Sequence, residues 1–153
     1  MALSVPLGLF AGCSREAQYY AEGSKRFEGS VQRSLGAVDA AWSPVEDGEW
    51  TYWFPNGERR ESGRYENGRR TGLWTQWYPH GQRRSQGARA WNGEARAALR
   101  EGPWTFWYAS GEIESRGVYR AGQREGQWEF THDDGGLDGD KTGQYHDDRR
   151  IDG

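Results

Sequence analysis

An aromatic motif recurs four times along this chain, and its spacing limits the folds that the chain can adopt. Each copy has a glycine followed two residues later by a tryptophan, and the first three continue with a second aromatic cluster and a turn ending in glycine. The copies begin at residues 48, 72, 102 and 126, at intervals of 24, 30 and 24 residues. Such a period is typical of repeat arrays, whose units bury their surfaces against their neighbours. We expect repeats at residues 48–71, 72–101, 102–125 and 126–153, the second enlarged by six residues.

The composition does not supply a conventional two-layer core. Only 19 of the 153 residues are Leu, Ile, Val or Phe, whereas nine are Trp and eight are Tyr. Aromatic side chains provide large apolar area with specific packing geometry, so periodic aromatic burial predicts a thin all-β body. A net charge of −3 and a pI near 5.7 give no basis for strong attraction to a phosphate backbone. We therefore expect no nucleic-acid partner.

The segment that follows each tryptophan predicts a β-hairpin. Asn56-Gly57 is a strong signal for a two-residue type I′ turn. That turn sets Trp50 opposite Gly63, where the indole is expected to lie over the bare glycine backbone. The same register sets Trp74 opposite Gly87 and Trp104 opposite Gly117. The residues expected to define the repeat structurally are Trp50, Trp74, Trp104, Trp128, Gly57, Gly63, Gly72, Gly81, Gly87, Gly111, Gly117 and Gly126.

A second row of tryptophans is expected on the other face of the sheet. Strand alternation places Trp53, Trp77 and Trp107 there in register. The predicted hairpin sets Arg60 opposite Trp53 and Arg84 opposite Trp77, where each guanidinium stack contributes about 0.5–1 kcal/mol. Exposed aromatic and Arg side chains anchor protein interfaces, so these five residues are predicted to bind a partner. The alternative is that these tryptophans only stiffen a sheet that lacks a second layer.

Two irregular segments accompany the full copies. Residues 19–29 resemble an incomplete copy whose tryptophan position is taken by Glu16, and residues 36–46 are expected to form a loop. Residues 13–47 are thus predicted to form a degenerate N-terminal repeat and loop. The six extra residues of the second copy fall within residues 88–101, where residues 95–100 are predicted to form a helical turn.

The amino terminus has the pattern of a processed signal. Residues 1–12 are apolar and small, and they lead into Cys13, the only cysteine of the chain. The segment Leu9-Phe10-Ala11-Gly12-Cys13 resembles the lipobox of bacterial lipoprotein signal peptides, whose cysteine is lipidated. This resemblance implies a signal peptide at residues 1–12, lipidation at Cys13 and an outer-membrane lipoprotein that faces the periplasm or the surface. The alternative is an unprocessed tail on a cytoplasmic protein.

The spacing between repeats carries a second resemblance. The pattern Tyr-x-x-Gly-x-x-x-Gly-x-Trp occurs at residues 65–74 and 119–128. It resembles the MORN (membrane occupation and recognition nexus) repeat, and more closely its bacterial variant with paired aromatics before an Asn-Gly-type turn. The resemblance implies an elongated, twisted, single-layer antiparallel β-meander used for self-association, protein binding or lipid contact. In the last copy Thr131 and His132 replace the second aromatic pair and Asp148 replaces the return glycine, so a terminal cap is expected.

Catalytic and metal-binding patterns are weak. Asp138, Asp140 and Thr142 match the first ligand positions of a calcium loop, but Arg149 stands where the loop needs a bidentate Glu. The contexts of the three histidines suggest no Ser-His-Asp or Cys-His arrangement. We therefore predict a non-enzyme without cofactor or metal.

These patterns together predict a membrane-tethered repeat scaffold that binds a protein partner in the cell envelope. One alternative is a toxin-neutralising antitoxin or immunity protein, because proteins with the variant repeat are labelled putative antitoxins. A second alternative is stacking of the row formed by Trp53, Trp77 and Trp107, the tryptophan strip, on cell-wall glycans.

Overall fold

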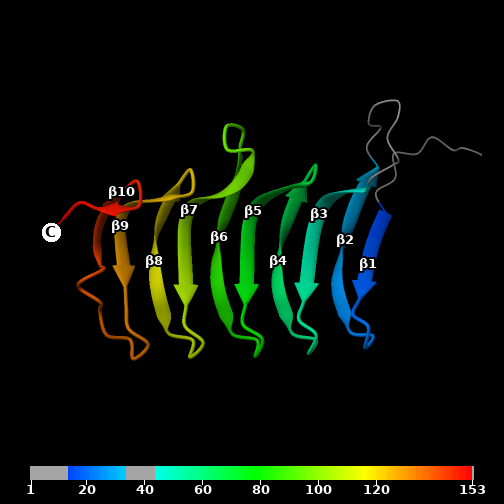
Figure 1. Cartoon of the computed structure of the whole chain (residues 1–153), viewed down its shortest axis with the longest axis horizontal. Coiled ribbons are helices and arrows are strands. Elements are labelled where there is room, and N and C mark those ends of the chain that lie inside the picture. Colours follow the sequence, from blue (N-terminus) through cyan, green and yellow to red (C-terminus); the bar gives the residue numbers. More distant parts are fainter. Residues whose placement is uncertain (1–13, 34–43, 153) are drawn as a thin grey trace, which may run out of the picture.

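The computed structural model describes residues 14–33 and 44–152. Within these ranges 11 antiparallel strands form one open sheet, and every strand pairs with its neighbours in sequence (Figure 1). The strands are β1 (Ser14–Tyr19), β2 (Lys25–Arg33), β3 (Pro44–Trp53), β4 (Arg59–Glu66), β5 (Arg69–Trp77), β6 (Arg83–Asn92), β7 (Ala97–Trp107), β8 (Ile113–Arg120), β9 (Gln123–Phe130), β10 (Gly143–His146) and β11 (Arg149–Arg150). The predicted all-β antiparallel meander is confirmed.

The hairpins stand side by side along the long axis of the molecule, as Figure 1 shows. The predicted signal peptide, Cys13 and residues 36–43 of the expected loop lie outside the described ranges. The prediction of a loop is wrong for residues 44–46, which pair with β2 as the start of β3. No helix in the described part of the chain is long and apolar enough to cross a membrane. In β1–β2, Glu16 is the Cα partner of Gly29, the relation that Trp50 has to Gly63 in β3–β4.

The turns inside the hairpins differ from the predicted two-residue type. The Phe54 N–H donates to the Glu58 carbonyl at 2.8 Å and the Gly57 N–H to the Phe54 carbonyl at 3.0 Å, so three residues form the loop. Only Gly57 among these three has a positive φ, 86°. Pro55 favours this turn, because it has no N–H to pair with Glu58 across a two-residue loop and its φ near −65° suits the first central position of a type I turn. The same three-residue turn forms at Ala109-Ser110-Gly111, which has no proline. The longer turn pairs Trp53 with Arg59 and not with Arg60. The register shifts again between Trp53 and Tyr52, so Trp50 still pairs with Gly63 as predicted.

Two-residue type I′ turns connect successive hairpins, at the strand ends opposite the three-residue turns. Asn67 and Gly68 both have positive φ, 49° and 74°, and the flanking residues Glu66 and Arg69 are paired. The same geometry recurs at Ala121-Gly122 and at Asp147-Asp148. Asp148 thus adopts the left-handed conformation of the return glycine, which Asp tolerates better than most residues.

The six extra residues of the second repeat lengthen a hairpin. The predicted helical turn at residues 95–100 is wrong, because β6 and β7 continue in register as far as Asn92 and Ala97. Residues 93–96 make the loop, and this hairpin extends beyond its neighbours in Figure 1. Continuing the ladder gives most of the added backbone groups a hydrogen-bonding partner, which a single helical turn does not.

A row of indoles forms the core, and each indole covers a glycine of the preceding hairpin. A Cβ built on Gly63 would lie under 3.0 Å from the Trp74 ring, and a Cβ on Gly87 equally close to the Trp104 ring. The same holds for Gly29 with Trp50 and for Gly117 with Trp128. The expectation that Trp50 covers Gly63 and Trp74 covers Gly87 is therefore wrong, although those pairs face each other in register.

Bulges between hairpins explain which glycine each indole covers. The regular pairing of β4 with β5 is interrupted between Ser62↔Thr75 and Arg64↔Thr71, so three residues of β5 face Gly63 alone. Gly72 begins this bulge with a φ of 62°. A bulge bends its strand and redirects the side chains beside it, which tilts the indole toward the previous hairpin.

The indole N–H groups reinforce these contacts. Trp50, Trp104 and Trp128 donate through Nε1 to the carbonyls of Ser30, Ala88 and Val118, at 2.9, 2.9 and 3.0 Å. Each of these acceptors is the residue after a covered glycine. Trp74 instead donates to the Thr71 carbonyl at 3.2 Å. These carbonyls belong to residues beside the interruptions of the ladder, and an indole N–H is a donor that Phe lacks.

Candidate functional site

The aromatic face of the sheet divides into two clusters. The buried residues of one are Val31, Trp50, Tyr65 and Trp74, and those of the other are Trp104, Tyr119, Trp128 and Tyr145. Within each cluster a tyrosine meets the next indole edge to face, with ring centroids 5.2 Å apart for Tyr65–Trp74 and 4.9 Å for Tyr119–Trp128. The clusters are separated at the second repeat.

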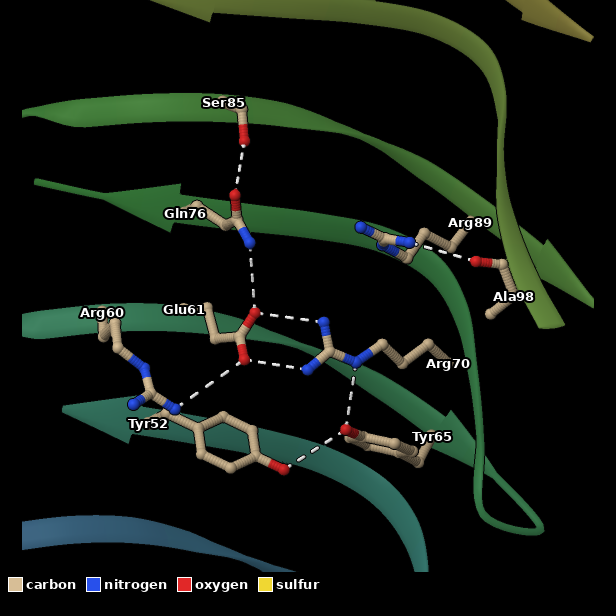
Figure 2. Close-up of polar contacts among 9 residues, drawn as sticks. All are labelled: Tyr52, Arg60, Glu61, Tyr65, Arg70, Gln76, Ser85, Arg89 and Ala98. Carbon is tan, nitrogen blue, oxygen red and sulfur yellow. Dashed lines mark hydrogen bonds and ion pairs between the residues drawn. The ribbon is translucent and has the colours of Figure 1, made fainter. Parts of the chain in front are cut away.

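Two residues on this face interrupt the aromatic pattern. Gln76 occupies the position two residues after the tryptophan, where the first and third repeats have Tyr52 and Phe106. Arg89 occupies the position of the clustered tyrosines, fifteen residues after the tryptophan. We call the group Glu61, Arg70, Gln76, Ser85 and Arg89 the polar break; it lies across β4, β5 and β6 (Figure 2).

An ion pair forms one side of the polar break. Arg70 donates to both oxygens of Glu61, from Nη2 at 2.8 Å and from Nη1 at 3.1 Å. Gln76 adds a hydrogen bond from Nε2 to the same carboxylate at 3.3 Å. Glu61 is only 8% exposed, so these donors replace its water. Burial works to lower the pKa of Arg70, but the hydrogen bonds and charge of Glu61 raise it above its ordinary value.

Polar contacts extend from this pair in both directions along the sheet. Arg70 Nε donates to the Tyr65 hydroxyl at 3.1 Å, which lies 3.3 Å from the Tyr52 hydroxyl. Burial, followed by the contact with Tyr65, raises the pKa of Tyr52. On the other side the Ser85 hydroxyl donates to Oε1 of Gln76 at 3.0 Å. Figure 2 shows this chain of contacts running from Tyr52 to Ser85.

The buried charge and N–H donors of Arg89 have few partners. Its Nη1 donates to the Ala98 carbonyl at 3.0 Å, but its buried Nε has no hydrogen-bonding partner. Arg100 is its direct cross-strand partner, and both guanidinium groups lie over the Trp104 ring, at 5.7 and 5.0 Å. Burial, then the charges of Arg70 and Arg100, lower the pKa of Arg89. Like charges directly opposite each other destabilise a sheet, so this arrangement is costly in the isolated chain.

The structure places the predicted tryptophan strip differently from the expectation. Trp53, Trp77 and Trp107 are half-buried, each beneath a cation of the preceding hairpin. Those cations are Lys25, Arg59 and Arg83, at 5.3, 4.6 and 4.9 Å from the respective rings. The predicted partners lie elsewhere, Arg60 over Tyr52 and Arg84 over Tyr78. The three-residue turn changes the register partners to Arg59 for Trp53 and Arg83 for Trp77, and each of these arginines lies over the tryptophan of the following hairpin. Binding of a partner by the strip stays a prediction.

The histidines have local structural contacts. His80 Nε2 lies 2.9 Å from the Ala109 carbonyl of the next turn. His146 Nδ1 lies 3.1 Å from Glu125, and this hydrogen bond, with the charge of Glu125, raises the pKa of His146. Asp138, in the segment compared with a calcium loop, is held by Lys141 at 2.8 Å. These contacts are ion pairs and turn contacts of a kind common on protein surfaces.

Two segments of the chain agree with a known repeat family. Residues 46–67 and residues 100–121 match the family model described as the MORN repeat variant. These two segments are similar to MORN-type repeats. Repeats of this type generally serve as non-catalytic scaffolds that bind proteins or membranes. A search of curated proteins found no match to the chain.

The two MORN matches lie on either side of the altered repeat. Residues 68–99, between them, contain Gln76 and Arg89. Sequence reasoning missed the arginines of the aromatic face, although Arg70, Arg100 and Arg124 each stand four residues before a repeat tryptophan. It also missed Gln76 and Arg89, which become visible when the repeats are aligned by their tryptophans.

Proposed function

We propose that this chain is a non-enzymatic MORN-type scaffold that binds a protein partner across the polar break. The observation that supports this is the replacement of two aromatic positions, by Gln76 and Arg89, on one face of one repeat. Each lost aromatic pair forgoes about 0.5–1.5 kcal/mol of packing energy. Departures from the pattern that the other repeats follow are expected at functional sites, and Arg89 in particular is left with a buried Nε that has no hydrogen-bonding partner.

The surroundings of the break suit a protein partner. Half-buried rings beside arginines are the residue types that dominate protein interfaces. Arg100 contacts the Trp104, Phe106 and Tyr119 rings at 5.0, 5.1 and 5.1 Å, so a partner would meet guanidinium and aromatic groups together. A chain with a net charge of −3 offers only a local positive site, which favours contact with a defined group over broad binding to a polyanion.

The experiment compares partner capture by the wild-type chain with capture by the double variant Gln76→Phe/Arg89→Tyr. This variant restores the aromatic pattern of the other repeats, so we expect thermal unfolding at or above the wild-type temperature. We expect every specific partner captured from envelope extracts by the wild type to be lost. Equal capture by a folded double variant would refute the proposal.

A second variant separates the polar break from the tryptophan strip. Replacing Trp53, Trp77 and Trp107 by Ser removes the strip. If only this variant loses the partner while remaining folded, the binding surface is the strip and not the break. Because the three rings are half-buried, unfolding must be measured on the same samples.

We further propose that the scaffold is tethered in the cell envelope through a lipid on Cys13. The apolar residues 1–12 and the lipobox-like segment support this. Mass spectrometry of the protein from its native host tests it. A diacylated N-terminal Cys13 is expected, and a mature chain that retains Met1 would refute it.

A further inference from the structure

We propose that Arg100 and Arg89 bind a carboxylate of an acidic side chain in the partner, so that the partner completes a charge arrangement that the neighbouring repeats complete internally. This inference rests on the proposed function and specifies the chemistry of its partner. Arg70, Arg100 and Arg124 each precede a repeat tryptophan by four residues, but their counter-charges differ.

Two of these arginines are neutralised by a carboxylate of the chain. Arg70, which lies over Trp74 at 4.2 Å, is held by Glu61 of the preceding strand at 2.8 Å. Arg124, which lies over Trp128 at 5.9 Å, is held by Asp148 at 3.1 Å. Both are thus cations stacked on an indole and paired with an acid.

Arg100 lies over Trp104 in the same way, but its surroundings differ. The position that corresponds to Glu61 is Ser85 on the preceding strand β6, 24 residues later. Arg100 Nη1 donates to the Tyr119 hydroxyl at 3.0 Å. Within residues 14–33 and 44–152, no carboxylate forms an ion pair with Arg100 or with Arg89.

Arg89 strengthens the site for an anion. It stands directly opposite Arg100 on the paired strand, so two guanidinium groups converge over one indole. Planar guanidinium groups bind carboxylates through paired, charge-assisted hydrogen bonds. An acid placed between them would relieve their repulsion by supplying a negative charge, as Glu61 supplies one to Arg70. The bidentate Glu61–Arg70 pair in the adjacent repeat is the internal precedent that favours a carboxylate.

The test uses a variant that supplies the carboxylate from within the chain. Ser85→Glu places an acid at the position of Glu61, and Ser85→Gln is the uncharged control of the same size. The probe is a capped peptide of alternating Glu and Thr, with a Gln and Thr peptide as its control and inorganic phosphate as a separate arm. Binding is followed at low salt by the NMR signals of the arginine Nε–H groups.

We expect the Glu peptide, but not the Gln peptide, to shift the Arg89 and Arg100 signals. Ser85→Glu should weaken this binding by about tenfold or more relative to Ser85→Gln, the loss typical of one charge-assisted contact, because only Glu supplies a competing charge. Arg100→Gln should weaken it similarly, which keeps the test valid if Ser85→Glu does not fold. Unchanged arginine signals, equal binding by a folded Ser85→Glu chain, or binding of phosphate without the peptide would each overturn the inference.

The failure of this inference is distinguishable from failure of the proposed function. If the peptide does not bind but Gln76→Phe/Arg89→Tyr still abolishes partner capture, only the carboxylate assignment is wrong. If the peptide binds as expected but the double variant captures partners normally, the anion site stands and the proposed scaffold surface is wrong.

Discussion

Replacing Gly87 by Ala tests the contact between hairpins. Whether this substitution raises or lowers the free energy of unfolding depends on the indole that covers the residue. Gly87 lies in β6 and has no positive φ, so its backbone accepts Ala without strain. If nothing covered the residue, Ala would stabilise the fold by about 0.4–1 kcal/mol by restricting the unfolded chain. In the structure, however, the new Cβ would lie under 3.0 Å from three atoms of the Trp104 indole.

The size of the change in the free energy of unfolding depends on how far the Trp104 indole can move. Trp104 is 3% exposed and its N–H is bonded to the Ala88 carbonyl, so the ring has little freedom to shift. Forcing one extra methyl group into such packing costs about 1–3 kcal/mol. If the indole is displaced altogether, the cost approaches the roughly 3–5 kcal/mol of a lost buried Trp. We expect a decrease of at least about 1 kcal/mol in the free energy of unfolding.

The assay is urea unfolding followed by circular dichroism, with Gly143→Ala as the matched control. Gly143 occupies the equivalent position opposite Trp128, but a Cβ there would meet the ends of the Asp152 and Arg150 side chains. Those exposed ends can move, so we expect a change within about 0.5 kcal/mol. A neutral or stabilising Gly87→Ala would refute the packing argument, as would an equal loss in both variants.

Three further predictions concern other contacts of the sheet. Glu61→Gln should lower the unfolding free energy by about 1–3 kcal/mol, because it leaves Arg70 partly buried without a counter-charge; an unchanged urea midpoint would contradict this. Trp104→Phe should cost about 1–3 kcal/mol through the lost indole hydrogen bond and lost packing, and a neutral result would show that this N–H bond contributes nothing. Glu125→Gln should return the pKa of His146 toward 6.5 in an NMR titration, because Glu125 raises it in the folded chain. Because the pKa of His146 is raised in the folded chain, the His146–Glu125 pair stabilises the fold below about pH 6.5 and loses this effect as the pH rises through the raised pKa. A pKa of His146 that is the same in both proteins would argue against the contact.

The fold was predictable because its signals are local and periodic. Repeat spacing, aromatic strands and glycine turns fix the meander, and the facing pairs Trp50–Gly63, Trp74–Gly87 and Trp104–Gly117 are confirmed. The turn type was not predicted, because Pro55 opposes the local preference of Asn56-Gly57. The helical turn at residues 95–100 failed because strand pairing overrides the helix propensity of an alanine-rich segment.

The candidate site was less predictable, since it depends on contacts between repeats. The bulge that directs Trp74 onto Gly63 arises where two hairpins meet, and single-hairpin reasoning does not include it. The one-residue change at the turn also makes Arg83, not Arg84, the register partner of Trp77, and the cation over the Trp77 ring is Arg59 of the preceding hairpin. Gln76 and Arg89 are visible as departures from the repeat, but only the structure places them on the same face as Arg70 and Arg100.

The most direct test of the account is an NMR measurement of the glycine α-proton shifts in the wild-type chain. If indoles cover the preceding hairpins, the α-protons of Gly29, Gly63, Gly87 and Gly117 lie against an aromatic ring. Their signals should then be displaced strongly upfield, and the signal of Gly143, which faces Asp152 and Arg150, should not. Ordinary shifts at the four covered glycines would contradict the central claim that each indole joins one hairpin to the hairpin before it.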